Sequence, residues 1–445
     1  MNINMKTKEN IRWAALQPLT GGMYLGAEKA IGHPAEFILS FPGIGDAHYN
    51  KKGEFTSCGN EYHLMKYLEK KNRLPNYMVF DKNMFEDGDT NVTLKPSQWT
   101  QHEIYQSDFE KIDIVVGVPV CSGLSAATIA KSETKDTRNC NMIWLTKYAL
   151  EKIQPLVYIF ENAPRLFTSA GSDVRSQLNE IARKNHYSVL YYKTDTFLHN
   201  NAQKRLRTFV VFMKWRYDSP CMPAKFDFES NTVPLEEMFS RALSTSTQQF
   251  SPEIKETEKI QLKYLEHLAG KDWQKTIGRY PDVYFKNNIH MLDDFMQFIS
   301  TQCDEFKQEY KDKLTSYLLH CKEKLNAGKN FYSAFIGRPG ENFIDAVMFK
   351  VINVMMHPNE NRKISVREYL TFMGHPQDFE MQGTDKMEYL AQIGQNVPVD
   401  TAAFIVGQAA KIVMKWYNTE IYRGDDVHKQ NVMFIDNIKH TITYD

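Results

Sequence analysis

The stretch Ile112-Asp113-Ile114-Val115-Val116-Gly117-Val118-Pro119-Val120-Cys121-Ser122-Gly123-Leu124-Ser125 decides the fold class. It opens with a short apolar run that predicts a buried strand, followed by a loop of small residues that carries a cysteine. In an α/β sheet, ligands bind beyond the carboxyl ends of the strands, so Cys121 lies where reactive groups are exposed. Its thiolate would be a nucleophile, and the alternative is an inert cysteine buried in the core.

Strand-like and helix-like segments alternate around this stretch, from residue 35 to residue 215. Expected strands are 37–41, 112–117, 156–160, 188–192 and 208–213, and expected helices are 141–153 and 174–184. This alternation predicts an α/β fold with a doubly wound, mostly parallel sheet. Beyond it, residues 216–252 are an irregular connector, 253–327 are charged and helical, and 400–417 form an amphipathic helix.

The composition excludes few classes of function. The chain has 445 residues, enough for two or three domains, and its 54 basic residues balance its 54 acidic ones. A net charge of zero gives no overall electrostatic attraction for nucleic acid or an anionic membrane, but it allows a local basic cleft. The six cysteines have no zinc-site spacing, so we expect no metal site and reduced thiols in a cytoplasm. No apolar run approaches the ~20 residues of a membrane span.

A glycine-containing turn, Phe41-Pro42-Gly43-Ile44-Gly45-Asp46, follows the first expected strand. Glycines in the first strand-to-helix turn of such a sheet let the backbone approach a cofactor. About twenty residues further on, Glu61 offers a carboxylate where dinucleotide-binding folds hold a ribose. The alternative is an ordinary glycine turn, because two glycines at this spacing are a weak signal.

Two polar segments follow Cys121. Phe160-Glu161-Asn162-Ala163-Pro164 ends the strand at 156–160, which places Glu161 on the same sheet edge as Cys121. Desolvation there would raise the pKa of Glu161 and suit it to proton donation, unless it is a structural carboxylate or helix cap. Gln203-Lys204-Arg205-Leu206-Arg207 leads into the strand at 208–213. Its two arginines point the same way on an extended segment, toward a phosphate, a carbonyl oxygen or solvent.

In this order, the segments resemble the motifs of the cytosine-C5 DNA methyltransferase family. Phe41–Asp46 is similar to the family's cofactor loop F-x-G-x-G-G, and Gly117–Ser125 to its nucleophile loop G-G-P-P-C-Q-G-F-S. Further similarities are Ser107–Phe109 to G-D-I, Phe160–Pro164 to E-N-V-P, Gln203–Arg207 to Q-x-R-x-R, Arg362–Phe379 to R-x-L-T-V-R-E…G-F-P-x-x-F and Gln392–Ile405 to Q-I-G-N-A-V-P…A. Residues 1–34 and 216–345 are not covered.

The resemblance implies a DNA (cytosine-5-)methyltransferase that uses S-adenosyl-L-methionine. Cys121 would add to C6 of a flipped cytosine, and Glu161 would hydrogen-bond or protonate N3. Arg205 would support the flipped ring and the thiolate, while Arg207 would pair with a carboxylate or phosphate. The implied cofactor contacts are Phe41, Gly43, Gly45, Glu61, Asp108, Pro119, Asn396 and Val397. The Gln392–Ile405 segment is expected to fold against the Phe41–Asp46 loop.

The resemblance also divides the chain. Residues 1–215 would hold the cofactor and nucleophile motifs, 216–345 would read the target sequence, and 346–445 would complete the catalytic domain. Expected DNA contacts are Ser125, Gln203, Lys271, Lys275 and Arg279. For the helices at 253–327, the alternative interpretation is that the aromatic side chains form a core and the charges face solvent.

Three departures from the family pattern leave other functions open. Val120 and Ser122 replace the Pro and Gln beside the nucleophile, and Asp46 replaces the last glycine of the cofactor loop. The alternatives are a C5-pyrimidine enzyme with an altered cofactor or an RNA or nucleotide substrate, and a non-catalytic DNA-binding relative. For the main interpretation we expect double-stranded DNA as partner, no membrane, a monomer, and the cytoplasm of a bacterium or phage-infected host. A cognate restriction endonuclease is a further candidate partner.

Overall fold

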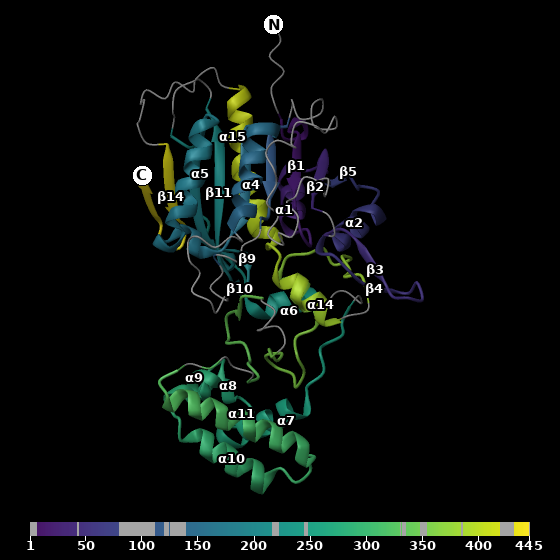
Figure 1. Cartoon of the computed structure of the whole chain (residues 1–445), viewed down its shortest axis with the longest axis vertical. Coiled ribbons are helices and arrows are strands. Elements are labelled where there is room, and N and C mark those ends of the chain that lie inside the picture. Colours follow the sequence, from purple (N-terminus) through teal and green to yellow (C-terminus); the bar gives the residue numbers. More distant parts are fainter. Residues whose placement is uncertain are drawn as a thin grey trace.

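A computed structural model describes residues 7–41, 44–79, 112–119, 124, 139–215, 222–243, 248–329, 331, 335–347, 354–383, 386–418 and 431–444. These residues form two bodies (Figure 1). The larger body is layered around a sheet, and the smaller one is a group of helices at the opposite end of the long axis. Of the expected site residues that the structure describes, Glu61, Glu161, Gln203, Arg205 and Arg207 lie in the larger body, and Lys271 and Lys275 lie in the smaller one.

The central sheet has nine strands in the order β5-β2-β1-β6-β7-β11-β8-β14-β15. They are β1 (Trp13–Leu16), β2 (Phe37–Ser40), β5 (Asn76–Val79), β6 (Ile114–Gly117), β7 (Val157–Asn162), β8 (Tyr187–Asp195), β11 (Leu206–Lys214), β14 (Val432–Asp436) and β15 (Thr441–Tyr444). All neighbours pair in parallel except β11 with β7 and β8, and β15 with β14. The predicted α/β fold with a mostly parallel, doubly wound sheet is therefore confirmed.

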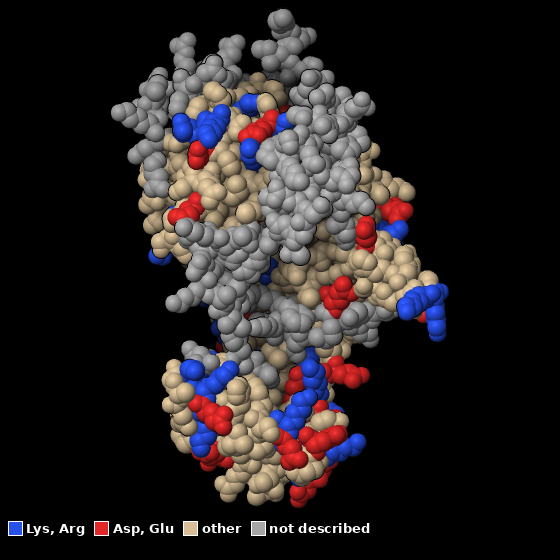
Figure 2. Space-filling view, viewed as in Figure 1, with Lys and Arg blue, Asp and Glu red and all other residues tan. Residues whose placement is uncertain are grey.

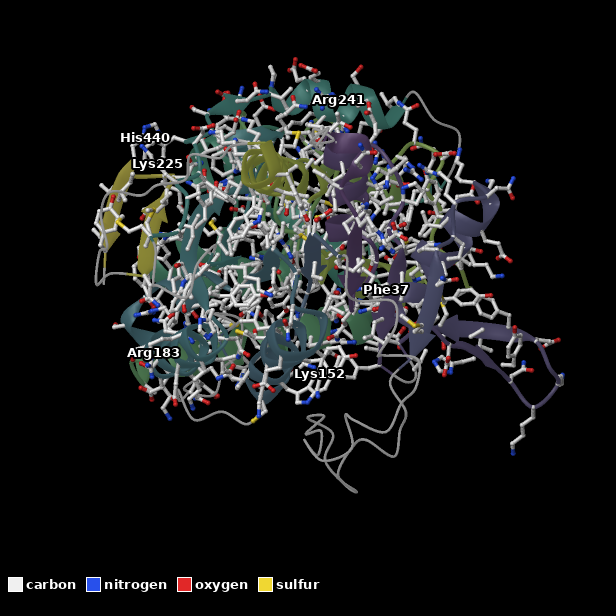
Figure 3. The ribbon with its side chains drawn as sticks, turned by 90° about the horizontal axis from the view of Figure 1, so that it is seen from above. Phe37, Lys152, Arg183, Lys225, Arg241 and His440 are labelled. Atoms are coloured by element: carbon white, nitrogen blue, oxygen red, sulfur yellow. The ribbon has the colours of Figure 1, made fainter. Side chains whose placement is uncertain are left out.

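Helices cover both faces of this sheet (Figure 3). One face carries α1 (Gly22–Ile31) and α15 (Val399–Asn418), and the other carries α4 (Cys140–Tyr148), its π-helical extension 149–153 and α5 (Ser172–Lys184). Alternate residues of a strand point to opposite faces, so β11 contributes Phe209 and Val211 to one core and Val210 and Phe212 to the other. Burial on both faces explains why these strands are continuous apolar runs.

The first strand is β1, which the sequence analysis did not predict. β1 lies between β2 and β6 and is followed by α1. The chain runs outward from β1 to β2 and β5 on one side and from β6 to β7 on the other, so the strand order reverses between β1 and β6. Ligand sites of doubly wound sheets lie at this reversal. The Phe41–Asp46 turn therefore follows the second strand, and placing it after the first strand was wrong.

Shorter elements complete the larger body. These are the turn Lys8–Asn10, β3 (Ala47–Tyr49), β4 (Phe55–Cys58), α2 (Asn60–Lys70), the short helices Pro164–Phe167, Ser169–Gly171 and Thr196–Leu198, β9 (His199–Asn201), β10 (Gln203–Lys204), β12 (Asn231–Thr232), α6 (Leu235–Leu243), β13 (Ile344–Asp345), α13 (Val366–Phe372) and α14 (Lys386–Gly394). Within the described residues, the stretch 388–417 has the length and composition of a membrane-spanning helix, but 61% of its apolar window is buried in the protein.

The smaller body has its own apolar core. It consists of α7 (Glu256–Ala269), α8 (Trp273–Ile277), α9 (Pro281–Asn287), α10 (Met291–Gln302) and α11 (Gln308–Asn326). At its centre, the rings of Tyr264 and Phe295 stack with centroids 4.0 Å apart. Most aromatic side chains of 253–327 therefore form a core, which agrees with the alternative interpretation of this region.

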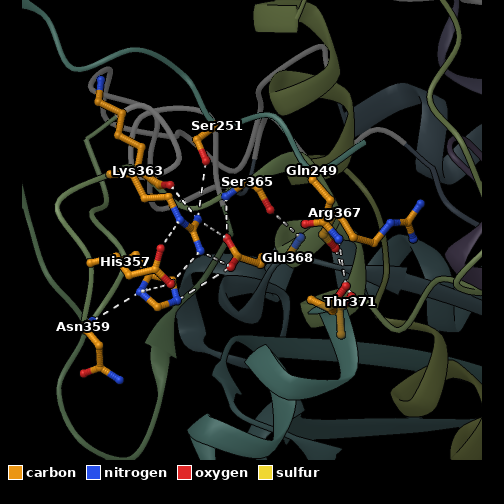
Figure 4. A network of polar contacts seen from close by, with 12 residues as sticks. Gln249, Ser251, His357, Asn359, Lys363, Ser365, Arg367, Glu368 and Thr371 are labelled. Carbon is orange, nitrogen blue, oxygen red and sulfur yellow. Dashed lines mark hydrogen bonds and ion pairs between the residues drawn. The ribbon is translucent and has the colours of Figure 1, made fainter. Parts of the chain in front are cut away.

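A polar network joins the two bodies near α13 (Figure 4). Ser365 caps α13, and its backbone N–H donates to the buried Glu368 carboxylate at 2.6 Å. Arg362 donates to both oxygens of Glu368, at 2.7 and 2.8 Å. The adjacent Lys363 ammonium forms a buried ion pair with Glu258 of α7, at 2.7 Å. This contact connects α7 to the segment before α13. Removing one of the two partners would leave an uncompensated buried charge.

The close packing of α1 against the C-terminal segment gives a stability prediction. A β-carbon on Gly22 would overlap the backbone carbonyl of Val397, whereas a β-carbon on Gly407 in α15 would meet no atom within 4 Å. We expect Gly22→Ala to destabilise the protein by about 1–3 kcal/mol, as overpacking does. Gly407→Ala is the matched control and should be neutral or stabilising by up to about 1 kcal/mol. Thermal unfolding of both variants tests this, and equal melting temperatures would contradict it.

Candidate active site

The geometry of the sheet brings Glu161 and Arg207 together. β7 ends at Asn162, and the antiparallel β11 begins beside it, so the end of one strand lies next to the start of the other. The Arg207 guanidinium forms an ion pair with the Glu161 carboxylate at this edge. Glu161 is 4% exposed. Burial raises the pKa of this carboxyl above its usual value, and Arg207 opposes part of that rise. The desolvated carboxyl expected from the sequence is thus present.

The neighbouring strand β6 carries the cysteine loop. β6 lies parallel to β7, with Gly117 paired to Phe160, so both strands end at the same edge. Pro119, two residues beyond β6, is buried. Cys121, the expected nucleophile, lies outside the described residues, as do Gly43, Asp108 and Ser125. What the structure shows is that the Cys121 loop starts one strand away from Glu161.

Arg205 and Gln203 have structural partners in place of the expected base or DNA contacts. The Arg205 guanidinium donates to the carbonyl oxygens of Val347, Gly394 and Asn396, at 2.7–2.9 Å. Gln203 is fully buried and donates to the Phe372 carbonyl at 2.9 Å. A side chain enclosed in this way cannot reach DNA, so the predicted DNA contact of Gln203 is wrong. The order of the motifs along the chain predicted the correct edge of the sheet for these residues, but it did not predict which groups each side chain contacts.

The loop between β1 and α1 has an unusual backbone. Gln17 and Leu19 have φ angles of 48° and 53°, and Gly21 has 98°. Positive φ is uncommon outside glycine and is often retained at functional sites. The Gln17 side chain is 4% exposed, and its carbonyl oxygen is buried without a hydrogen-bond partner among the described residues. This loop lies at the strand-order reversal, and the sequence analysis missed it; the apolar run Trp13–Leu16 before Gly21-Gly22 was the available signal.

The C-terminal segment holds this loop. The Gly22 N–H donates to the Asn396 side-chain carbonyl at 2.9 Å, and the Thr20 hydroxyl donates to the Gln392 carbonyl at 3.1 Å. Val397 is buried against the position where Gly22 lacks a β-carbon. These contacts of Gln392–Ile405 go to the loop after β1. Its predicted docking on Phe41–Asp46, part of which lies outside the described residues, stays a prediction.

The residues expected around the second turn are largely internal. Glu61 is fully buried and accepts a hydrogen bond from the Tyr77 hydroxyl at 3.1 Å. Its other carboxylate oxygen is buried without a hydrogen-bond partner among the described residues, so the predicted contact with a ribose stays a prediction. Phe41 is buried and packs edge-on against Trp144, with ring centroids 5.8 Å apart. Gly45 allows the Tyr77 hydroxyl to approach, because a β-carbon would overlap it. Burial raises the pKa of Glu61 to about 7.

The three expected DNA contacts in the helical body differ from one another. Lys271 and Lys275 are exposed, and Lys275 pairs with the exposed Asp272 at 3.4 Å. Arg279 pairs with Asp345 at 3.2 Å, and its guanidinium lies 4.5 Å from the centroid of the Phe343 ring. Arg279 therefore connects the helical body to β13. The two lysines are the more exposed of the three and can reach a phosphate from the surface.

Comparison with known proteins identifies the class. The chain matches the family described as C-5 cytosine-specific DNA methylase over residues 81–411. It therefore belongs to that family, as the resemblance predicted, and it is a DNA (cytosine-5-)methyltransferase. Among the described residues, no group of three His, Cys, Asp or Glu side chains is placed to hold a metal ion.

Individual relatives are distant. The chain is 21% identical over 348 residues to the Type II methyltransferase M.Bpa9945I of Bacillus paralicheniformis, covering 72% of this chain and 75% of that one. It is 22% identical over 335 residues to the Type II methyltransferase M.FnuDI of Fusobacterium nucleatum, covering 73% and 84%. Its fold is similar to that of the Entamoeba histolytica methyltransferase EhMeth, with a TM-score of 0.50, 11% identity and coverage of 92% and 97%.

The buried Glu61 gives a prediction for stability against pH. Its pKa is about 7 in the folded protein and 4.5 as a free side chain, so between these values the unfolded state has lost a proton that the folded state keeps. Folding stability therefore falls as pH rises from 4.5 to 7, by about 3 kcal/mol in total, and this contribution is constant above 7. Glu61→Gln should lack that fall, so its stability relative to wild type should rise through this window. Denaturant unfolding between pH 4.5 and 8 measures this; parallel curves would contradict it.

Proposed function

We propose that the chain transfers a methyl group from S-adenosyl-L-methionine to C5 of a cytosine flipped out of duplex DNA, through a covalent adduct with Cys121. The observation that carries the proposal is the buried Glu161–Arg207 pair at the edge where the Cys121 loop begins. A carboxyl group kept in a desolvated site with a raised pKa is suited to donating a proton to a ring nitrogen. The family match supports the same chemistry.

The loop after β1 fits the cofactor. It lies at the strand-order reversal, and the buried Gln17 carbonyl oxygen, without a partner among the described residues, can accept a hydrogen bond from an ammonium group. Asn396 and Val397 shape this loop from the C-terminal side. When bound, S-adenosyl-L-methionine would supply an electrophilic methyl group on a sulfonium. The residues of this chain would then hold it beside the base and exclude water.

Cytosine C5 needs activation, because it is a poor nucleophile within an aromatic ring. The Cys121 thiolate would add to C6, and the electron pair of the C5–C6 bond would shift toward N3 and O2. Glu161 would donate a proton or a hydrogen bond to N3 and stabilise that charge. Arg207 holds the Glu161 carboxyl in place, since their ion pair restricts its orientation.

The remaining steps restore the ring. C5 would take the methyl group, leaving a neutral thioether, so C5 would carry both the methyl and its original proton. A base would remove that proton, its electron pair would re-form the C5=C6 double bond, and the C6–sulfur bond would break to release the Cys121 thiolate. A proton given to N3 would return to Glu161. The base must leave the stack for the thiol to reach C6, so the DNA is bound with the target nucleotide flipped out.

DNA would be held between the sheet edge and the helical body. On the face seen in Figure 2, lysine, arginine and acidic side chains are intermixed over the helical body, so no broad basic patch dominates that face. Lys271 and Lys275 lie on the exposed connection into α8 and on α8 itself. We therefore assign phosphate contacts to these two lysines and sequence choice to residues 216–345.

The names of two relatives support a proposal for the setting of the enzyme. The two curated relatives are Type II methyltransferases. We propose that this chain likewise acts beside a restriction endonuclease, as a monomer, in the cytoplasm of a bacterium or phage-infected host. Protection of host DNA from cleavage would be its consequence.

Covalent catalysis is tested on Cys121 and Glu161. DNA with 5-fluorocytosine at the target should trap a covalent adduct on wild type, because fluorine at C5 cannot leave as a proton. Cys121→Ala should form none and lose methyl transfer. Glu161→Gln should slow transfer by ~10²–10⁴ with little change in DNA affinity. Cys140→Ala, which removes an exposed thiol, is the control and should keep activity. Turnover by Cys121→Ala would refute the mechanism.

The lysine contacts are tested by salt dependence. Replacing Lys271 and Lys275 with Ala should weaken DNA binding and reduce the slope of log K against log salt by about 2, since each lost phosphate contact removes about one unit. Lys184→Ala on α5, which breaks an exposed pair with Glu180, is the matched control. An unchanged slope in the double variant would show that these two lysines do not contact phosphates.

A further inference from the structure

A buried polar chain lies behind the loop that follows β1. His375, in the turn after α13, is 5% exposed, and its Nε2 is 2.9 Å from the side-chain nitrogen of Asn396. Asn396 is 1% exposed, and its side-chain oxygen accepts the Gly22 N–H. Three segments distant in sequence thus meet through one asparagine. Neither the proposed mechanism nor the motif comparison gives His375 a task.

The direction of each hydrogen bond in this row follows from the Gly22 N–H, whose role as a donor is certain. The Gly22 backbone N–H can only donate, so the oxygen end of the Asn396 amide must face it. The NH₂ end then faces His375, and Nε2 must be the acceptor, with the proton on Nδ1. The Thr20 carbonyl oxygen is 3.3 Å from Nε2, so the amide contact is the closer of the two. A protonated ring would set a donor against a donor.

We propose that His375 is a positioning residue for the cofactor loop: by accepting from Asn396, it fixes the amide orientation that holds Gly22. Its link to S-adenosyl-L-methionine rests on the proposed function, whereas its link to the loop rests on the hydrogen bonds alone. A phenylalanine, which the family motif has at this place, would fill the space but could not accept from Asn396. The Asn396 amide would then be free to rotate and present its NH₂ group to Gly22.

Two further observations support this role. Burial lowers the pKa of His375 to about 4, so the ring is neutral at physiological pH, as an acceptor must be. The ring also packs on Phe379, with centroids 4.5 Å apart, which holds it in the plane that aims Nε2 at the amide. The same Asn396 receives a hydrogen bond from Arg205 on its backbone carbonyl, so backbone and side chain are both restrained.

Amide hydrogen exchange of the unliganded protein tests the loop directly. In His375→Phe, peptides covering residues 17–31 should exchange roughly 5- to 10-fold faster, as expected for losing one buried hydrogen bond. His199→Phe is the matched control, because His199 is a buried neutral histidine bonded to Thr194 at a different place. It should leave these peptides protected. Equal protection in His375→Phe and wild type, or equal loss in both variants, would overturn the proposal.

Cofactor binding provides the second readout. Calorimetry should show S-adenosyl-L-methionine binding His375→Phe several-fold more weakly than wild type, and KM for the cofactor should rise with kcat nearly unchanged. In Asn396→Asp, His375→Phe should have no further effect, because a carboxylate offers an oxygen to the Gly22 N–H in either orientation and needs no histidine to orient it. If the effects of the two substitutions on cofactor binding were additive, the proposed link between His375 and Asn396 would be contradicted. A wild type that binds no S-adenosyl-L-methionine would refute the proposed function while leaving the exchange result to decide this one.

The wild-type protein offers a measurement that does not depend on a folded variant. With ¹⁵N-labelled histidine, the ring nitrogens of His375 should report the neutral form with its proton on Nδ1 and an unprotonated, hydrogen-bonded Nε2. The signal is assigned by its absence in His375→Gln. A proton on Nε2 would overturn the proposed direction of the chain.

Discussion

The hydrogen bond from the Gly22 N–H to the Asn396 side chain is the contact on which the site depends. It ties the loop after β1 to a segment more than three hundred residues later, at 2.9 Å and out of contact with water. Gly22 can make it only because it lacks a β-carbon. α15 also packs on α1, so the first loop is held in the native structure by the C-terminal part of the chain. Gln17 and Leu19 in this loop have positive φ angles.

The direction of β11 supplies the second constraint. In an all-parallel sheet, the residues before β11 would lie at the opposite edge from Glu161. The antiparallel pairing of β11 with β7 brings Arg207 to the end of β7 instead. Burial favours the neutral carboxyl and Arg207 favours the charged one, and burial has the larger effect. The balance leaves a carboxyl that holds a proton more readily than an exposed one, at the edge where the cysteine loop begins.

The layered fold and the Glu161 edge could be predicted from sequence because apolar runs and chain order carry them. The apolar run of β1 is only four residues and precedes the segments that resemble the family, so its loop was missed. The contacts of individual side chains were also not predicted. Gln203 and Arg205 are polar residues in a segment that resembles a family motif, yet both side chains are buried by contacts with Phe372 and Val347 that no local pattern contains. The ion pair between Arg279 and Asp345 was likewise not predicted.

Nucleoside mass spectrometry of DNA from cells that express the chain tests the proposed methyl transfer. The DNA should contain 5-methyl-2′-deoxycytidine, which should be absent from cells expressing Cys121→Ala, and bisulfite sequencing should place it at one short recurring sequence. Unmodified DNA, or a methyl group on the exocyclic nitrogen of cytosine or adenine in place of C5, would contradict it.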